Sequence, residues 1–427
     1  MRDITNGEGM QIVGKYGVFE AVHEAWGRMR LYGSLFLLAT LLVGCSIASD
    51  RNAVPLSLVD KATVPGLTTV RSWGDEVPRD IASTLKARLP NMGRLAEASV
   101  RENGHPVVNV LALSGGGSDG AFGAGVLTGW SQAGTRPVFQ VVTGISAGAL
   151  VAPFAYLGTS YDRQLIQIWT QHNTEDLVQT PALTGLFGGV ALADTTPMAS
   201  LIAKYVDRRL LDRIATEYRN GRMLLIGTHN LDAQRFVVWN MGEIAVSRDP
   251  RALELFRQVI LASASIPGVF PPVRITVSAG GQTLEELHVD GGISKQVFVA
   301  PVQLSFREFD RFYAAPPVLR FYVIRNGKLS PEYEVVQAST FGIAVRSLGS
   351  LTKSQGLGDI FEIYTAAKRD GAEFNLAAIP ADFQVPSKEV FDPTYMRALF
   401  ALGVERARRG YPWMKAPPEL NRLKPSH

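Results

Sequence analysis

The sequence predicts an α/β fold with a mainly parallel central sheet, and three neighbouring segments support this prediction. Residues 107–113 form a short, nearly continuous apolar run with β-branched side chains, as expected for a strand buried on both faces. Residues 121–130 have helix-compatible spacing, and residues 138–143 form a second apolar run. Strand, helix and strand at this spacing predict a βαβ unit whose two strands pair in parallel.

Later segments continue the alternation of strands and helices. Apolar runs at 223–227 and 318–324 predict further strands, and residues 341–368 and 394–409 predict helices. Asp194 and Pro197 provide a capping residue and a first-turn proline for another helix. We find no internal repeat, and we expect residues 304–427 to complete the same domain as the first βαβ unit.

Composition limits the class of protein without naming a partner. The chain has 427 residues, 46% of them apolar, so it can bury a large core. Lys and Arg number 43 against 39 Asp and Glu, and no run of five or more like charges marks a nucleic-acid patch. A single cysteine excludes an intramolecular disulfide and a cysteine-rich metal site. We expect no metal or other cofactor and no nucleic-acid partner.

The N-terminal region has the features of a secretory signal. The apolar stretch 31–43 follows basic residues and is shorter than the roughly 20 residues of a membrane-spanning helix. Its end, Leu42-Val43-Gly44-Cys45, resembles the lipobox of bacterial lipoproteins, in which the cysteine is acylated; the alternative is a free cysteine closing a buried helix. The resemblance implies a lipid anchor in the cell envelope, and Ser46 after the cysteine favours the outer membrane.

This reading divides the N-terminal part of the chain into three segments. Residues 29–44 would be the signal peptide, and residues 1–28 would precede the true start of translation. Residues 45–106 would form a tether and an N-terminal extension, because they are polar, irregular and interrupted by prolines.

Two glycine-rich turns follow the first two predicted strands. The first, at 114–120, contains G-x-G-x-x-G, so a dinucleotide site is a rival interpretation. Such a site needs an acidic residue near the end of the second strand, and residues 137–146 contain none. The second turn, at 144–148, is a G-x-S-x-G sequence around Ser146, which fits a nucleophile elbow.

A serine nucleophile needs a base, and histidine is the usual one. His288 and His427 have the order Ser, acid, His of an α/β-hydrolase triad. His427 is the last residue, and His288 lies in an expected strand that leads to Asp290. The remaining histidines are His23, His105, His172 and His229.

Four motifs in order resemble the patatin-like phospholipase family. They are the triplet Gly115-Gly116-Gly117, the elbow around Ser146, the stretch 262–272 and the sequence Asp290-Gly291-Gly292. The resemblance covers about residues 107–295, and we assign 107–303 to the catalytic core. It implies a modified α/β-hydrolase fold, a three-layer sandwich, and an enzyme that hydrolyses acyl esters of lipids.

The resemblance also implies a role for each motif. Ser146 would be the nucleophile, and Asp290 would act as general base and then general acid, without a catalytic histidine. Backbone N–H groups of Gly115, Gly116 and Gly117 would form the oxyanion hole. The glycines that support the elbow and the dyad would be Gly144, Gly148, Gly291 and Gly292.

One position departs from the family pattern. Many members carry arginine two residues after the third glycine, where this chain has Asp119. We expect Asp119 either to favour lysolipids or weakly charged esters by repelling a phosphate, or to cap the helix that begins at Gly120.

Two other functions and one structural alternative stay open. The chain could be a triad esterase that uses His288, or a non-catalytic envelope protein that keeps the fold as a scaffold. The apolar, glycine-interrupted stretch 181–192 fits a lipid-facing lid and a buried loop equally well.

Overall fold

The computed structural model describes residues 51–77, 91, 95, 100–178 and 194–421. The chain divides into two compact units. One unit, Asn52–Ala182 and Val190–His427, holds every element described below; the other, Met1–Arg51 and Leu183–Gly189, is described only at Arg51. The predicted signal peptide, Cys45, the stretch 181–192 and His427 lie outside the described residues.

The centre of the unit is a mixed sheet whose middle strands are parallel. Parallel pairing joins β5 to β4, β4 to β3, β3 to β9 and β9 to β10. Antiparallel pairing joins β6 and β8 to β5, β1 to β6, β7 to β8 and β2 to β3. The bounds are β1 Arg71–Trp73, β2 Arg101–Glu102, β3 His105–Leu113, β4 Val141–Ile145, β5 Met223–Asn230, β6 Arg235–Asn240, β7 Val273–Ala279, β8 Gln282–Asp290, β9 Val318–Lys328 and β10 Glu373–Ile379.

The predicted βαβ unit is present as β3, α3 (Gly120–Gln132) and β4. Its strands pair in parallel, with Leu113 opposite Gly144. β4 begins later than the sequence predicted, because Val138 is 61% exposed and its carbonyl accepts a hydrogen bond from the Asn109 side chain at 3.2 Å. The backbone there is held by a side chain and not by a neighbouring strand.

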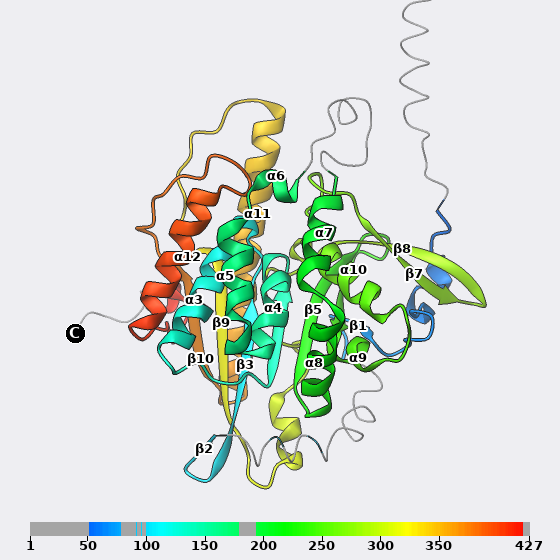
Figure 1. Cartoon of the computed structure of the whole chain (residues 1–427), viewed down its shortest axis with the longest axis horizontal. Helices are drawn as coiled ribbons and strands as arrows, with labels where there is room; N and C mark the ends of the chain where they lie inside the picture. Colours follow the sequence, from blue (N-terminus) through cyan, green and yellow to red (C-terminus); the bar gives the residue numbers. More distant parts are fainter. Residues whose placement is uncertain (1–50, 78–90, 92–94, 96–99, 179–193, 422–427) are drawn as a thin grey trace, which may run out of the picture. The chain divides into compact units, whose positions relative to one another are not determined.

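Helices cover both faces of the sheet, which gives a three-layer α/β fold (Figure 1). Val108, Val110 and Ala112 of β3 pack with α11, Thr340–Arg369, on one face, while Leu111 and Leu113 belong to the larger core on the other. The larger core takes in α3 and the helices α4 Ala147–Leu157, α5 Asp162–Gln171, α6 Thr174–Leu177, α7 Thr196–Tyr205, α8 Arg208–Arg219, α9 Met241–Val246, α10 Ala252–Ala264 and α12 Pro393–Arg408.

Short 3-10 helices and one terminal helix complete the description. They are η1 Leu56–Lys61, η2 Gly117–Asp119, η3 Thr159–Tyr161, η5 Gly291–Ile293, η6 Phe306–Phe312 and α13 Pro418–Asn421. At the start of α7, the Thr196 N–H donates to the Asp194 carboxylate at 2.9 Å, and Pro197 lies in the first turn. Across the described ranges, no helix is both long and apolar enough to span a membrane.

Candidate active site

Ser146 lies on a sharp turn between β4 and α4. Its backbone has φ 54° and ψ −123°, a conformation that costs a non-glycine residue energy and that clusters at functional sites. The turn needs a glycine at position 148, where a Cβ would lie 2.3 Å from the Leu113 carbonyl oxygen. A Cβ on Gly144 of β4 would lie 2.5 Å from the Gly148 carbonyl oxygen, so close backbone packing on both sides holds the serine in this strained geometry.

The stretch that begins at residue 262 lies beneath the elbow and beneath Asp290. The Ser146 N–H donates to the Ser263 hydroxyl at 3.0 Å, and that hydroxyl donates to the Gly227 carbonyl at 2.6 Å. The Asp290 N–H donates to the Ser265 carbonyl at 2.9 Å. One short segment therefore fixes the backbone of both residues of the expected dyad.

Asp290 is the last residue of β8 and is almost completely buried, with 6% of its surface exposed. The Ser146 hydroxyl hydrogen-bonds to its carboxyl group, and the Gly292 N–H donates to Oδ1 at 2.7 Å. Burial raises the pKa of Asp290 to about 6, although both hydrogen bonds act in the opposite direction. A carboxylate with this pKa is a stronger base than an exposed aspartate and is still largely ionised at neutral pH.

The three loop glycines differ in what their N–H groups do. Gly115 donates its N–H to the Gln296 carbonyl at 3.0 Å, so this donor is already occupied. Gly116 and Gly117 have φ values of 156° and 55°, and no acceptor for their N–H groups is found among the described residues. A Cβ on Gly115 would lie 3.1 Å from the Ser146 Cβ, so the loop borders the nucleophile.

A buried arginine supports the glycine loop from β9. Arg325 Nη1 donates to the Ser114 hydroxyl at 3.3 Å, to the Gly115 carbonyl at 3.4 Å and to Gln296 Oε1 at 3.2 Å. The next residue, Asn326, donates from its N–H to Ser114 Oγ and from its side chain to the Ser114 carbonyl, both at 2.8 Å. Neither residue was predicted; the available signal was a polar pair directly after the apolar run 318–324.

Gln296 connects this support to the loop that follows Asp290. Its side-chain Nε2 donates to the Gly292 carbonyl at 2.7 Å, and its N–H donates to the Asp359 carboxylate at 2.6 Å. Gln296 is 4% exposed and was also not predicted. The expected oxyanion loop and the loop after the expected base are therefore parts of one hydrogen-bonded network.

Asp119 does not cap the helix that it precedes. Its backbone is already helical, with φ −65°, and its side chain makes no capping hydrogen bond, whereas a capping residue is normally extended. The carboxylate instead accepts a hydrogen bond from the Tyr395 hydroxyl of α12 at 2.5 Å. Burial raises the pKa of Asp119 to about 6, against the lowering effects of Tyr395 and Arg325.

His288 is fully buried, and both of its ring nitrogens already have partners. Nδ1 contacts the Thr228 hydroxyl at 2.9 Å, and Nε2 contacts the Glu286 carboxylate at 2.9 Å. Arg71 forms an ion pair with the same carboxylate. This arrangement leaves neither nitrogen of His288 free to take a proton from Ser146.

The other described histidines are also engaged elsewhere. His105, His172 and His229 contact Pro316, Tyr205 and Ser294, respectively. In the part of the chain that the structure describes, no hydrogen bond joins a histidine to Ser146. The same residues contain no group of three or more His, Cys, Asp or Glu side chains that could hold a metal ion.

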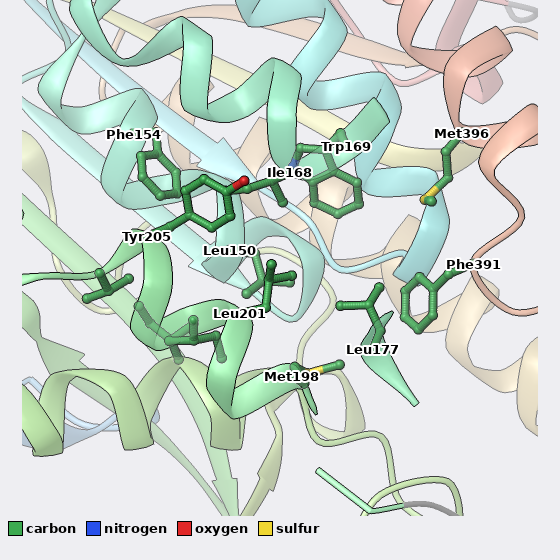
Figure 2. Close-up of a pocket in the computed structure, with 13 residues that line it drawn as sticks. Leu150, Phe154, Ile168, Trp169, Leu177, Met198, Leu201, Tyr205, Phe391 and Met396 are labelled. Carbon is green, nitrogen blue, oxygen red and sulfur yellow. The ribbon is translucent and has the colours of Figure 1, made fainter. Parts of the chain in front are cut away.

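An apolar pocket begins one helical turn beyond the nucleophile (Figure 2). Leu150 and Phe154 of α4 lie on one side, and Met198 and Leu201 of α7 lie on another. The pocket measures about 610 Å³ when the space that is open to solvent is included. Trp169 also lines it and packs so closely on Gly120 that a Cβ there would lie 2.2 Å from the ring. One wall of the pocket therefore reaches the helix that follows the glycine loop.

Fold and site together define an α/β protein with a serine at a strand-to-helix elbow and a buried aspartate bonded to it. Residues 111–302 match the family model described as patatin-like phospholipase. The match lies over the segments that carry Ser146 and Asp290, and the predicted fold class is confirmed. The match supports, in general terms, hydrolysis of lipid acyl esters.

Comparison with curated proteins gives no match. The solved structures that resemble the chain include VipD and ExoU. VipD from Legionella pneumophila has a TM-score of 0.33 and 13% identity, over 73% of this chain and 70% of VipD. ExoU from Pseudomonas aeruginosa, solved in complex with SpcU, has a TM-score of 0.32 and 14% identity, over 71% of this chain. The match spans about half of ExoU, 52% of its length.

Proposed function

We propose that this protein hydrolyses carboxylic esters of lipids, as a phospholipase A, lysophospholipase or carboxylester lipase, with a Ser146–Asp290 dyad. The observation that carries the proposal is the hydrogen bond from the Ser146 hydroxyl to a buried Asp290 carboxyl group whose pKa is raised to about 6. The strained backbone of Ser146 supports it, because such strain persists where a side chain must be held in one position.

The geometry supports a two-step acyl transfer. Ser146 Oγ attacks the ester carbonyl carbon while Asp290 accepts the hydroxyl proton, and the N–H groups of Gly116 and Gly117 stabilise the oxyanion. Asp290 returns the proton to the departing alcohol, which leaves an acyl ester on Ser146. Water then attacks this ester as Asp290 takes its proton, and the fatty acid leaves as the serine is protonated again.

The apolar pocket supports a lipid substrate for this chemistry. Leu150, which lines it, is one helical turn from Ser146, and the lining is apolar along α4, α5 and α7. An acyl chain whose ester carbon lies at Ser146 would bury its methylene groups there, at about 0.8 kcal/mol for each buried group. We therefore assign the pocket to the acyl chain of the substrate.

Labelling with a fluorophosphonate tests the dyad. Wild type should be labelled and should hydrolyse a soluble p-nitrophenyl ester, and Ser146→Ala should lose both properties. Asp290→Asn should lower the rate of labelling by about 10²–10⁴-fold, the usual contribution of general acid–base catalysis. Ser200→Ala, on the exposed face of α7, is the matched control and should behave as wild type.

Two outcomes would contradict the proposal. If Ser146→Ala were labelled and active, the nucleophile would be another residue. If folded wild type were neither labelled nor active, the non-catalytic scaffold would be the better account.

We further propose that acylated Cys45 anchors the protein to the outer membrane of a bacterial envelope. The support is the sequence Leu42-Val43-Gly44-Cys45 after a short apolar run, with Ser46 next. Wild type should incorporate radiolabelled palmitate and sediment with outer membranes, and Cys45→Ala should do neither. Palmitate incorporation by Cys45→Ala would place the modification elsewhere.

A further inference from the structure

Exposed apolar side chains gather on the first turns of α11 and the segment before it. Of sixteen large apolar side chains exposed in the described residues, seven fall within residues 333–351. Monomeric proteins rarely expose such a contiguous group unless it contacts a partner or a membrane. We call these seven residues the α11 patch: Tyr333, Val335, Val336, Ile343, Val345, Leu348 and Leu351.

The helical part of the patch protrudes into solvent. Ile343, Val345, Leu348 and Leu351 are 53%, 55%, 57% and 68% exposed, in contrast to the buried Ile360 and Ile363 farther along the same helix. In Figure 1 the first turns of α11, coloured gold, extend beyond the strands of the sheet. A protruding apolar helix offers side chains for insertion into a lipid surface. Val336, Ile343 and Leu351 also line a shallow, open hollow beside the helix.

The charged residues beside the patch are paired and leave little net charge. Arg346 pairs with Glu334 at 3.1 Å, and Lys353 pairs with Glu332 at 3.0 Å. Lys328 also lies 3.7 Å from Glu332. Three basic side chains therefore share two carboxylates, and the one net positive charge is a weak attraction for an anionic surface.

The patch adjoins the loop that follows Asp290. Gln355, one helical turn after Leu351, donates from its side chain to the Ile293 carbonyl at 3.3 Å. Ile293 closes η5, the 3-10 helix directly after Asp290, and is itself 43% exposed. At the next residue, Gly356, a Cβ would lie 3.1 Å from the guanidinium carbon of Arg325. The protruding turns and the proposed catalytic residues therefore share one supporting network.

We infer that the α11 patch inserts into the surface of an uncharged or zwitterionic lipid assembly and holds the dyad against it. The inference rests on the proposed function, because a lipid hydrolase has to reach esters packed in a bilayer or micelle. Burial of the apolar side chains in the lipid provides the binding energy. Because the nearby charges are paired, we expect binding to depend little on anionic lipid. Insertion next to η5 would bring the ester groups of that surface to Ser146.

A fluorescent probe tests insertion independently of catalysis. In the full chain with Cys45→Ser and Ser146→Ala, Leu348→Cys provides a single attachment point for an environment-sensitive nitrobenzoxadiazole dye. Phosphatidylcholine vesicles should shift the emission to the blue, and brominated phosphatidylcholine should quench it. The control is Val138→Cys, an exposed residue before the start of β4 and therefore at the opposite end of that strand from Ser146, where vesicles should change nothing.

A double variant connects the patch to turnover. Leu348→Asp with Leu351→Asp should lower hydrolysis of phosphatidylcholine vesicles by about tenfold or more, because two leucine side chains lose burial and two charges resist insertion. Hydrolysis of a soluble short-chain ester should stay within about twofold of wild type, since neither residue contacts the dyad. Val138→Asp should leave both activities unchanged.

Each alternative gives a distinct result. A dye at position 348 that vesicles leave unchanged would overturn the inference, whether or not the soluble ester is hydrolysed. If the emission at 348 changed with protein concentration in the absence of lipid, the patch would join two copies of the chain. If the emission shifted only with anionic phosphatidylglycerol vesicles, the conclusion that the patch binds uncharged or zwitterionic lipid would be wrong. If wild type did not hydrolyse the soluble ester, the proposed function would be refuted. The dye experiment would still be valid, because it does not depend on catalysis.

Discussion

Gly115 donates its backbone N–H to the carbonyl oxygen of Gln296 over 3.0 Å. This bond joins the glycine loop beside the nucleophile to the segment that follows the proposed base, and it removes Gly115 from the free donors of the loop. The N–H groups of Gly116 and Gly117 are then the candidates for the oxyanion hole. The sequence motif predicted three equivalent glycines. In the structure, the N–H group of Gly115 already has an acceptor, and those of Gly116 and Gly117 have none among the described residues.

The first prediction compares Gly116→Ala with Gly117→Ala. A Cβ at 116 would lie 2.2 Å from the Asn326 carbonyl oxygen, so the loop must shift and hydrolysis of a soluble ester should fall by about 10²-fold or more. At 117 no atom lies within 4 Å of an added Cβ. That variant should lose about 1–2 kcal/mol of stability from its positive φ, and its donor N–H stays in place. Equal activities of the two variants in steady-state assays would contradict this assignment.

The second prediction concerns Arg325. We expect Arg325→Gln to lower kcat by about 10²-fold with little change in KM, because the Gly115 carbonyl and Gln296 lose a shared donor and the loop loses its position. Arg325→Lys should recover part of the loss by restoring charge without the planar geometry of the guanidinium group. The matched control is Arg320→Gln, an arginine of β9 that pairs only with exposed acids. A change in melting temperature without a change in kcat would reduce Arg325 to a structural role.

The sequence could predict those parts of the site that depend on local backbone geometry. Ser146 directly follows β4, Asp290 is the last residue of β8, and both have glycines nearby in the sequence. The unit of β3, α3 and β4 is contiguous in the chain. The supporting residues could not be found in this way, because their contacts depend on strand order. Arg325 reaches Ser114 across 211 positions only because β9 lies next to β3.

The mixed edge of the sheet was missed for a related reason. β6 and β8 pair antiparallel to β5, and β1 from the N-terminal extension pairs with β6. β5 and β6 form a local hairpin, with Asn230 opposite Arg235. β1 and β8 instead pair with strands distant in sequence, and periodicity does not specify such a partner. The roles of Ser263 and Gln296 depend on the same long-range pairing.

The third prediction is the pH dependence of hydrolysis. Asp290 must be ionised to accept the serine proton, so kcat/KM for a neutral ester should rise with pH and reach half its plateau at about 6. Asp119 and Asp359 have pKa values raised to the same region, so Asp119→Asn and Asp359→Asn are needed as controls and should keep the midpoint. If either control variant shifted the midpoint, the rise of kcat/KM with pH would reflect the ionisation of the replaced residue and not that of Asp290.

Linkage gives this prediction a second readout in stability. The folded pKa of Asp290 lies above its unfolded value, so the native state binds more protons between about pH 4 and 6. The free energy of unfolding contributed by this group therefore decreases as pH rises through that window. Asp290→Asn should remove the decrease, which chemical denaturation at several pH values would measure.

The fourth prediction concerns His288. Replacing it by alanine removes a fully buried ring and leaves the Thr228 hydroxyl and the Glu286 carboxylate without one partner each, so we expect a loss of about 2–4 kcal/mol of stability. The folded fraction should nevertheless hydrolyse a soluble ester within about threefold of wild type. A triad enzyme would instead lose about 10²–10⁴-fold in kcat while it remained folded. Active-site titration separates these outcomes, because it counts the folded enzyme.

The last prediction uses the titration of Asp119 to find its effect on substrate choice. Its pKa is raised to about 6, so its negative charge develops as pH rises through that value. If this charge repels a phosphate, the turnover of a diacyl phospholipid divided by that of a neutral ester falls across the same pH range. Ionisation of Asp290 affects both turnovers equally, so it cancels in this ratio. Asp119→Asn keeps an acceptor for the Tyr395 hydroxyl and should give a ratio independent of pH. Tyr395→Phe removes a hydrogen bond that lowers the pKa of Asp119, so it should move the fall to higher pH. Wild type and Asp119→Asn ratios that coincide at every pH would show that Asp119 does not set the preference for the head group.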